Sequence, residues 1–345
     1  MSSTDQRVNW GILGCAAVAK NVAIPGIKNS SNSHVLAVAS RCLSKAKKFS
    51  ENFGIKKAYG SYAQLLDDPE IQVVYIPLIN SLHRDWTIRA AEKGKHVLCE
   101  KPLALNAYQA QEMADISERR GVLVMEVFAH RFHPQNIRAL ALIEEGRIGR
   151  PVSMTSIHSS GRPVAEDIRL SKEFGGGALM DKGCYCVNTA RFIIGFEPIS
   201  VFAQVTFGET GVDKRVVAHL KFPDGVSCCL NSGTHLALGA YQQGYEVFGK
   251  KGSIRVPEPF SQLPTYREGK VVNTSIFVTD HCHNVLRTEE ICFKGVNQWQ
   301  LQIEYFADQV LNRGFGLSPV RDGVSNMRVI DAIYQSSDEG CEVLL

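Results

Sequence analysis

The first 130 residues alternate short apolar runs with longer helical stretches, and this alternation is the feature that most restricts the fold. Apolar runs that lack a regular polar alternation are typical of parallel strands whose two faces are both covered by helices. Because connections between parallel strands are right-handed, the pattern predicts an α/β fold that begins with a Rossmann, doubly wound parallel sheet. The apolar runs are VNWGILG (8–14), HVLAVAS (34–40), IQVVYIPL (71–78), KHVLCEKP (95–102) and GVLVMEVFA (121–129).

After about residue 150 the pattern changes to many strand-like runs with little helix between them. The Pro-Asp-Gly triplet at 223–225 separates two such runs and indicates a hairpin. This part is therefore expected to be an α+β domain with a large, open, mostly antiparallel sheet, followed by amphipathic helices at 297–313 and 324–340. We place the domain division between residues 125 and 126, so the expected domains are 1–125 and 126–345.

Composition excludes several classes of protein. The chain has 345 residues, 44% hydrophobic and 21% charged, with a net charge of +3 spread along its length, which is ordinary for a globular protein and argues against a nucleic-acid partner. No apolar run approaches the roughly 18 residues of a membrane span, and the N-terminus has no signal-peptide core. The ten scattered cysteines indicate free thiols and a cytoplasmic location. The His-Cys-His triplet at 281–283 matches no standard zinc spacing, so no metal is expected.

The first strand runs into the small-residue turn GILGCAAVA (11–19). Gly14, Ala16 and Ala19 occupy the positions of a G-x-G-x-x-G/A dinucleotide fingerprint, with alanine in the second position. A glycine allows the tight turn, and small residues let the backbone approach a pyrophosphate at the helix N-terminus. We therefore expect Gly14, Cys15, Ala16 and Ala17 to bind a dinucleotide; the alternative is a strand–helix turn without a ligand.

The end of the second strand indicates which dinucleotide is bound. An NAD site usually carries an acidic residue here for the ribose hydroxyls, whereas this strand ends in Ser40 and Arg41, with Lys45 close behind. A guanidinium can pair with a 2′-phosphate, and Ser40 and Lys45 can add donors. The sequence thus favours NADP over NAD; the alternative is a surface arginine. Ser44 is a possible N-cap of the following helix.

The fourth apolar run ends in Glu100, Lys101 and Pro102. Ligands bind at the carboxyl ends of parallel strands, so this lysine is expected at the nicotinamide end of the cofactor site. Pro102 restricts the backbone before it and orients the lysine, and Asn106 is a plausible N-cap of the next helix. The alternative is a lysine that merely extends from a strand end into solvent.

Several ordered motifs resemble the Gfo/Idh/MocA oxidoreductases. HVLCEKPLALN (96–106) is similar to their Glu-Lys-Pro segment, VYIPLINSLHRDW (74–86) to their Asn-x-x-His loop, and GGGALMDKGCY (175–185) to their second signature. The tyrosine in that signature is closest to the branch that contains glucose–fructose oxidoreductase, dimeric dihydrodiol dehydrogenase and NADP-dependent D-xylose dehydrogenase. The resemblance implies that 1–125 binds the dinucleotide, and that 126–345 binds substrate and forms a homodimer or higher oligomer through its sheet.

The resemblance also implies roles for single residues. Tyr185 would donate or accept the substrate proton, and Lys101 would hold the nicotinamide ribose and the reacting oxygen. A free tyrosine has a pKa of about 10, and a nearby ammonium lowers it, so a Lys–Tyr pair makes a workable general acid/base. Without the resemblance, Tyr185 is a packed tyrosine on an apolar helix. The further implied residues are Asp181 and Arg169 for substrate and Glu100, Asn80 and His83 for the cofactor.

The chain departs from the family pattern at Ala16 and at Lys182, which adds a positive charge beside the proposed acid/base and either points outward or binds an anionic substrate. His158, Arg162 and Asp167 lie in the segment that faces substrate in the family. The expected function is an NAD(P)-dependent oxidoreductase that transfers hydride between nicotinamide and a CH–OH group of a sugar, polyol or diol. The alternative is a non-catalytic, dinucleotide-binding sensor of the same fold.

Overall fold

The computed structural model describes residues 6–161, 167–237, 239–260, 272–282, 285–312 and 319–345. The chain forms two compact units. The first holds the chain through Ala129 and regains residues 297–324; the second begins at His130 and includes the C-terminus. No helix among the described residues is long and apolar enough to cross a membrane.

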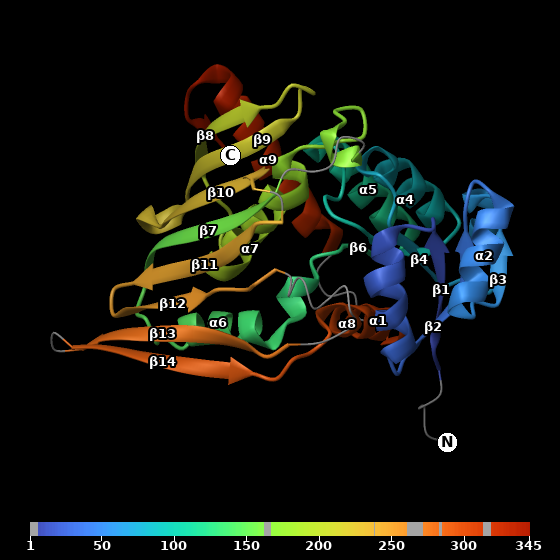
Figure 1. The fold of residues 1–345 in the computed structure, drawn as a ribbon, viewed down its shortest axis with the longest axis horizontal. Helices are drawn as coiled ribbons and strands as arrows, with labels where there is room; N and C mark the ends of the chain where they lie inside the picture. Colours follow the sequence, from blue (N-terminus) through green and yellow to red (C-terminus); the bar gives the residue numbers. More distant parts are fainter. Residues whose placement is uncertain (1–5, 162–166, 238, 261–271, 283–284, 313–318) are drawn as a thin grey trace. The chain divides into compact units, whose positions relative to one another are not determined.

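The first unit contains a six-stranded parallel sheet in the order β3-β2-β1-β4-β5-β6 (Figure 1). The central strands are almost completely buried, which explains their continuous apolar sequences. The strand order reverses between β1 and β4, so a ligand crevice is expected at the carboxyl ends of these strands. The strands are β1 (Val8–Leu13), β2 (Ser33–Ala39), β3 (Lys57–Tyr59), β4 (Val73–Ile76), β5 (His96–Cys99) and β6 (Val124–Glu126).

Short polar residues, Ser61 and Asn106, begin two of the helices in this unit. The Asn106 side chain accepts a hydrogen bond from the Gln109 backbone N–H (2.9 Å), which confirms the predicted N-cap. The Ser44 prediction was wrong, because that helix begins at Leu43 with Cys42 at the N-cap. The helical segments are η1 (Ala19–Ala23), α1 (Ile24–Asn29), α2 (Leu43–Phe53), α3 (Tyr62–Leu66), η2 (Asn80–Leu82), α4 (His83–Glu92) and α5 (Ala107–Arg120).

Helix α8 (Gln298–Asn312) returns to the first unit, although the predicted division at residue 125 assigned it to the second domain. Phe306 of α8 packs against Trp10 of β1, with ring centroids 5.6 Å apart. The Asn32 side-chain amide donates to the Glu304 carbonyl oxygen (2.9 Å) and to the Asp308 carboxylate (2.7 Å). The first unit is therefore built from two separate stretches of the chain.

The second unit contains a nine-stranded sheet in the order β14-β13-β12-β11-β7-β10-β9-β8-β15. All neighbouring strands for which a register is given are antiparallel except β7 and β10. The predicted Pro223–Gly225 turn joins β9 to β10, with Asp224 and Gly225 at positive φ. The strands are β7 (Pro151–Gly161), β8 (Ser200–Phe207), β9 (Asp213–Lys221), β10 (Ser227–Leu236), β11 (Tyr241–Gly249), β12 (Gly252–Val256), β13 (Thr274–Cys282), β14 (Val285–Phe293) and β15 (Val343–Leu344).

Helices cover one face of this sheet and leave the other open (Figure 1). Helix α7 (Cys184–Ile194) lies against β7 and β10. The hydroxyl oxygens of Ser336 and Ser337 in α9 (Pro319–Glu339) accept hydrogen bonds from backbone N–H groups of β8. Helix α6 (Pro134–Glu144) packs against β12 and β13.

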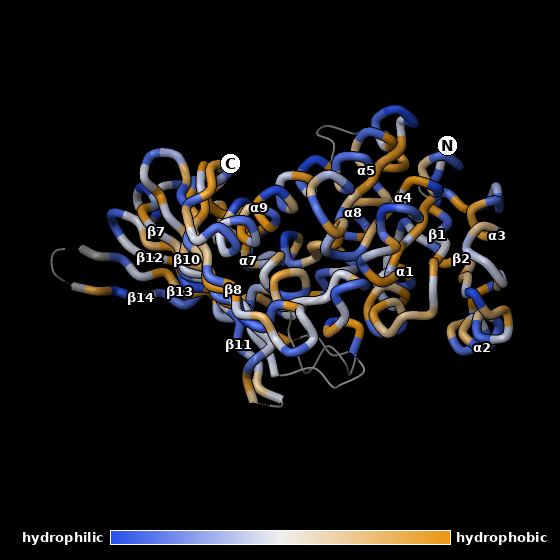
Figure 2. The backbone as a smooth tube through the Cα atoms, turned by 90° about the horizontal axis from the view of Figure 1, so that it is seen from above, coloured by the Kyte–Doolittle hydropathy of each residue, from blue (hydrophilic) through white to orange (hydrophobic). Residues whose placement is uncertain are grey.

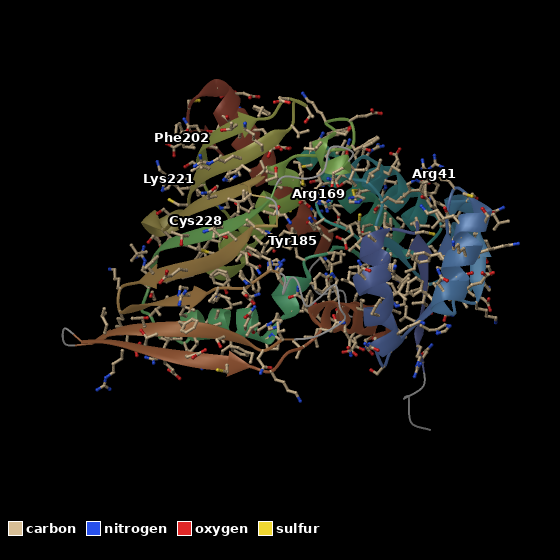
Figure 3. The ribbon with its side chains drawn as sticks, in the orientation of Figure 1. Arg41, Arg169, Tyr185, Phe202, Lys221 and Cys228 are labelled. Carbon is tan, nitrogen blue, oxygen red and sulfur yellow. The ribbon has the colours of Figure 1, made fainter. Side chains whose placement is uncertain are left out.

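Residues along these strands alternate between buried and exposed positions, and the colours of the tube in Figure 2 are correspondingly mixed. The open face displays Phe202, which is 50% exposed, together with Val217 and Phe248. Figure 3 shows Phe202 on β8, the strand next to the edge strand β15.

Candidate active site

The turn after β1 has the geometry expected of a dinucleotide site. Gly14 has φ +109°, which only glycine adopts readily, and its N–H donates to the Ala39 carbonyl oxygen (2.8 Å). A Cβ at Gly14 would lie 3.1 Å from a Leu78 methyl carbon. Ala19 is fully buried, as the third fingerprint position requires for helix packing. Gly14, Cys15, Ala16 and Ala17 therefore lie at the carboxyl end of the central strand.

The residues predicted to choose the dinucleotide lie at the end of β2. Ser40 is buried and its hydroxyl accepts a hydrogen bond from the Cys42 N–H (3.3 Å), whereas Arg41 and Lys45 are exposed to solvent. The Arg41 guanidinium lies beside the Tyr62 hydroxyl; burial raises the pKa of Tyr62, and Arg41 opposes that shift. The exposed cations Arg41 and Lys45 thus follow the buried Ser40 hydroxyl at this strand end. Figure 3 shows Arg41 at the β2–α2 end of the unit.

The loop that carries Lys101 is fixed by buried polar contacts. The Tyr75 hydroxyl donates to Glu100 Oε1 (2.6 Å), and the Lys101–Pro102 peptide bond is cis. Burial raises the pKa of Glu100, while the Tyr75 hydrogen bond and the Lys101 charge oppose that shift. Glu100 therefore supports the loop from within the protein, and Lys101 follows it at the carboxyl end of β5, half-buried.

His83 lies inside the loop that was predicted to line the cofactor. Its side chain is completely buried, and its ring nitrogens contact the Pro102 carbonyl oxygen (2.8 Å) and the Leu78 carbonyl oxygen (3.0 Å). Burial lowers the pKa of His83, so the ring is neutral near pH 7 and donates from one nitrogen only. The side chain packs against two loop carbonyls and donates to one of them, which makes it a positioning residue. Asn80 lies just before it in η2 and is partly exposed, as a cofactor ligand would be.

Two buried polar residues near this loop were missed in the sequence analysis. Tyr75 lies within an apolar run, which gives no sign that its hydroxyl donates to Glu100. Glu126 accepts a hydrogen bond from the Leu103 N–H (2.8 Å), and its backbone carbonyl accepts one from the Gln302 side chain of α8 (3.2 Å). The sequence signal available for Glu126 was a charged residue inside an apolar strand, because a buried carboxylate needs hydrogen-bond donors.

In the second unit, a glycine-rich segment and a buried aspartate fix the start of the helix that carries the predicted acid/base. Gly177 has φ +121°, and a Cβ there would lie only 2.0 Å from Asp213 Oδ1. Asp213 accepts hydrogen bonds from the Leu179 N–H (2.6 Å) and the Tyr334 hydroxyl (2.8 Å). The glycine therefore makes room for a carboxylate that binds the first turn of η5 (Leu179–Gly183). Asp213 was also missed, since it lies in a distant strand.

Asp181 lies within η5, a π-helical turn of the kind often found at functional sites. Its carboxylate lies 3.1 Å from Arg169 Nε and 3.6 Å from Lys182 Nζ. Arg169 also pairs with Asp167 (2.9 Å), and Asp181 is the main cause of the raised pKa of Arg169. The predicted residues Arg169, Asp181 and Asp167 thus form one network, and Lys182 joins it rather than pointing away.

Tyr185 lies in the first turn of α7, surrounded by rings. The ring centroids of His158, Phe260 and His130 lie 5.2, 5.4 and 5.5 Å from that of Tyr185. His158 Nε2 contacts the Tyr241 hydroxyl (2.7 Å), and burial holds the pKa of His130 well below its usual value. Figure 3 labels Tyr185 and Arg169 in this unit. The arrangement packs the tyrosine ring among three other rings.

The predicted site residues fall into two groups. The fingerprint residues, Arg41, Asn80 and Lys101 belong to the first unit, while Arg169, Asp181 and Tyr185 belong to the second. Arg162 and the side chains of the His-Cys-His triplet at 281–283 lie outside the described residues.

Comparison with known proteins agrees with this two-part arrangement. Residues 8–128 match a model described as "Oxidoreductase family, NAD-binding Rossmann fold", and residues 137–255 match the GFO/IDH/MocA C-terminal domain. The chain belongs to the GFO/IDH/MocA oxidoreductase family. Its predicted fold class, a Rossmann sheet followed by a mostly antiparallel α+β domain, is confirmed by both the topology and these matches.

Several relatives of this family member have known activities. The chain is 36% identical to D-xylose 1-dehydrogenase (NADP(+)) 2 of Haloferax volcanii, over 97% of this chain and 99% of that protein. It is 34% identical to trans-1,2-dihydrobenzene-1,2-diol dehydrogenase of Xenopus laevis, over 90% and 91%. The structure of KijD10, a 3-ketoreductase from Actinomadura kijaniata in complex with NADP and TDP-benzene, is 30% identical and superposes with a TM-score of 0.86 over 96% of this chain and 98% of that one.

Proposed function

We propose that this family member is an NADP-dependent oxidoreductase that acts on a CH–OH group of a neutral sugar, polyol or diol. The observation that carries the proposal is that Lys101 and Tyr185 each lie at the end of a strand or helix that buried polar contacts hold in place. Lys101 ends a buried strand on a loop fixed by Glu100 and His83, and Tyr185 opens a helix whose start is fixed by Asp213. Lysine and tyrosine are both residue types that can transfer a proton to or from a substrate hydroxyl within hydrogen-bond reach.

The residues of the first unit fit a dinucleotide. The positive φ of Gly14 and the small residues after it leave a cradle that a Cβ at Gly14 would crowd. When bound there, NADP would supply the hydride acceptor or donor of the reaction. Arg41 and Lys45 would pair with its 2′-phosphate, and Lys101 would orient its nicotinamide ribose.

In this mechanism the protein handles a single proton. In the oxidation direction Tyr185 accepts the proton of the substrate hydroxyl as hydride leaves the same carbon, and in reduction it returns that proton. The Lys101 ammonium favours the phenolate form and so brings the acid/base closer to neutral pH. Asp181, held by Arg169 and Lys182, would orient a neighbouring substrate hydroxyl.

The charges around Asp181 favour an uncharged substrate. Two cations, Arg169 and Lys182, stand against two anions, Asp167 and Asp181, so the network has no net charge. An acidic substrate would therefore have to displace an existing ion pair to gain a partner. This argues against the anionic-substrate role that the sequence left open for Lys182.

Activity on a substrate panel tests the proposal. Neutral aldoses, polyols and trans-diols should reduce NADP at pH 7 to 10, and uronic acids of the same stereochemistry should be poorer substrates. Absorbance of NADPH reports the rate. A protein that binds NADPH but turns over no member of the panel would instead support the sensor role.

Replacing Arg41 with alanine should weaken NADPH binding by roughly 10- to 100-fold, because a hydrogen bond between charged groups contributes about 1.5–3 kcal/mol. NADH binding should change little, since NADH lacks the 2′-phosphate. Fluorescence titration measures both affinities. Lys47 is also exposed on α2, so Lys47→Ala is the matched charge-removal control. Tighter binding of NADH than NADPH to the unchanged protein would contradict the assignment of NADP.

We also propose that the open face of the nine-stranded sheet joins two copies of the chain. Phe202, Val217 and Phe248 are exposed on one face among polar residues, and large exposed apolar groups on a sheet favour association. Sedimentation velocity should give a dimer or larger species, and Phe202→Lys should shift it towards monomer; a monomer at all concentrations would refute this. A cytoplasmic location remains a prediction from the thiols.

A further inference from the structure

His158 packs against Tyr185 in the interior of the second unit. It lies in β7 and is only 2% exposed, although its segment was expected to face substrate. Its imidazole meets the Tyr185 ring edge-on, with centroids 5.2 Å apart and an interplanar angle of 71°. It also stacks on the Phe260 ring, with centroids 4.7 Å apart and an angle of 24°. A side chain buried to this degree contacts its protein neighbours, so an effect of His158 on a reaction would pass through Tyr185.

Tyr241 fixes the plane of this imidazole. It lies on β11, the antiparallel neighbour of β7. The Tyr241 hydroxyl oxygen and His158 Nε2 are 2.7 Å apart, which is a hydrogen-bond distance, and the two rings meet edge-on with centroids 5.5 Å apart. The outer torsion of a histidine side chain is broad, so packing alone leaves the imidazole room to rotate. A hydrogen bond at one ring nitrogen stops that rotation and sets the surface against which Tyr185 packs.

Lys182, a departure from the family pattern, contacts the same tyrosine. Its Nζ atom lies 5.5 Å from the centroid of the Tyr241 ring, within the range of a cation–π interaction, and 3.6 Å from Asp181 Oδ2. Tyr241 is thus held at its ring by an ammonium and at its hydroxyl by a buried imidazole. It connects the charged network around Asp181 with the ring cluster around Tyr185.

The other two rings of the cluster are also fixed by polar contacts. Phe260 is 1% exposed, and its backbone N–H donates to Gln243 Oε1 of β11 (3.1 Å). His130 Nε2 lies 3.0 Å from Thr189 Oγ1 of α7. Apolar packing alone would leave such rings several orientations, whereas each polar contact selects one. The cluster is therefore built to hold the enclosed tyrosine ring in a single orientation.

We propose that His158 and Tyr241 are positioning residues that orient the Tyr185 ring, so that its hydroxyl stays directed at the substrate. The proposal rests on the proposed function, in which Tyr185 accepts the substrate proton. Neither positioning residue transfers a proton: His158 holds the Tyr185 ring, and Tyr241 holds His158. Because a displacement of about 1 Å can cost about 10²-fold in rate, a partial loss of orientation should lower kcat while cofactor and substrate binding are kept.

Tyr241→Phe tests the pair, because it removes one hydroxyl and keeps the ring that Lys182 contacts. We expect kcat for the oxidation of a neutral sugar to fall about tenfold, while KM and the Kd for NADPH stay within about twofold. Tyr245→Phe is the matched control: Tyr245 lies on the same strand, is 3% exposed, and donates its hydroxyl proton to Asn136 Oδ1 (3.0 Å). Both variants should lose a few degrees of thermal midpoint, but only Tyr241→Phe should lose kcat. Unchanged kcat in Tyr241→Phe, or equal losses in the two variants, would overturn the proposal.

A double variant tests whether Tyr241 acts through His158. His158→Phe keeps a ring against Tyr185 but loses the bond to Tyr241, so kcat should fall by a similar factor. Adding Tyr241→Phe to that variant should cost less than about a further twofold, because the two residues act in series. Losses that multiply would mean that the residues act separately, against the proposal.

Fluorine NMR distinguishes a failure of this proposal from a failure of the proposed function. In protein labelled with 3-fluorotyrosine, the Tyr185 resonance is assigned by its loss in Tyr185→Phe. It should shift or broaden in Tyr241→Phe and stay in place in Tyr245→Phe, because only the first change releases the imidazole beside it. If no substrate of the panel is turned over, the proposed function fails, while this spectrum still decides whether the pair orients the ring. An unmoved Tyr185 resonance in Tyr241→Phe would refute the positioning role.

Discussion

Replacing Tyr185 with phenylalanine is expected to lower kcat for sugar or polyol oxidation about 10²-fold or more, because the substrate hydroxyl then has no positioned proton acceptor. The phenyl ring keeps the contacts with His158, His130 and Phe260, so the helix and the ring cluster should be preserved. Steady-state kinetics under saturating NADP measure the loss.

Two measurements show whether that loss is chemical. The affinity for NADPH should stay within about twofold of the original value, since Tyr185 belongs to the second unit and is not proposed as a cofactor ligand. The same substitution at Tyr108, which is 73% exposed on α5, controls for nonspecific effects of losing a phenol. Near-normal turnover of Tyr185→Phe would refute the acid/base role and leave Tyr185 as a packed residue.

The fold of the first unit could largely be predicted because its strands are buried on both faces, so each appears as a continuous apolar run. Helix α8 could not be placed, since an amphipathic pattern shows that a helix has an apolar face but not which sheet covers it. The contact of Phe306 with Trp10 depends on a return of the chain across most of its length. For the same reason the predicted boundary at 125 differs from the observed grouping.

The candidate site shows a similar limit. Glycines, charged strand ends and the two signatures could be found in the sequence, because each has a local spacing. The supporting contacts of Tyr75, Glu126 and Asp213 could not, because each joins residues that are distant in sequence. His83 illustrates the difference: its motif was visible, but only the structure shows that its ring is buried against two backbone carbonyls.

Replacing Lys101 with methionine is expected to lower kcat about 10²-fold, because a preorganised positive charge near a developing oxyanion contributes on that scale. Methionine keeps much of the apolar stem, so the change removes mainly the charge. The Lys101 charge also counters the burial of Glu100, and Tyr75 still donates to that carboxylate in the variant. The thermal midpoint should therefore fall by only a few degrees, which calorimetry would measure. Lys93, exposed at the end of α4, provides the matched control as Lys93→Met.

The pH profile tests whether Lys101 acts on Tyr185. An ammonium lowers the pKa of a nearby phenol, so removing it should raise the pKa above which oxidation proceeds. The rising limb of kcat/KM should then move to higher pH in Lys101→Met, and the rate deficit should shrink as the pH increases. In the double variant with Tyr185→Phe the two losses should not multiply, because residues that act as a unit are non-additive. A uniform deficit at every pH, with multiplicative losses, would mean that the lysine only binds the cofactor.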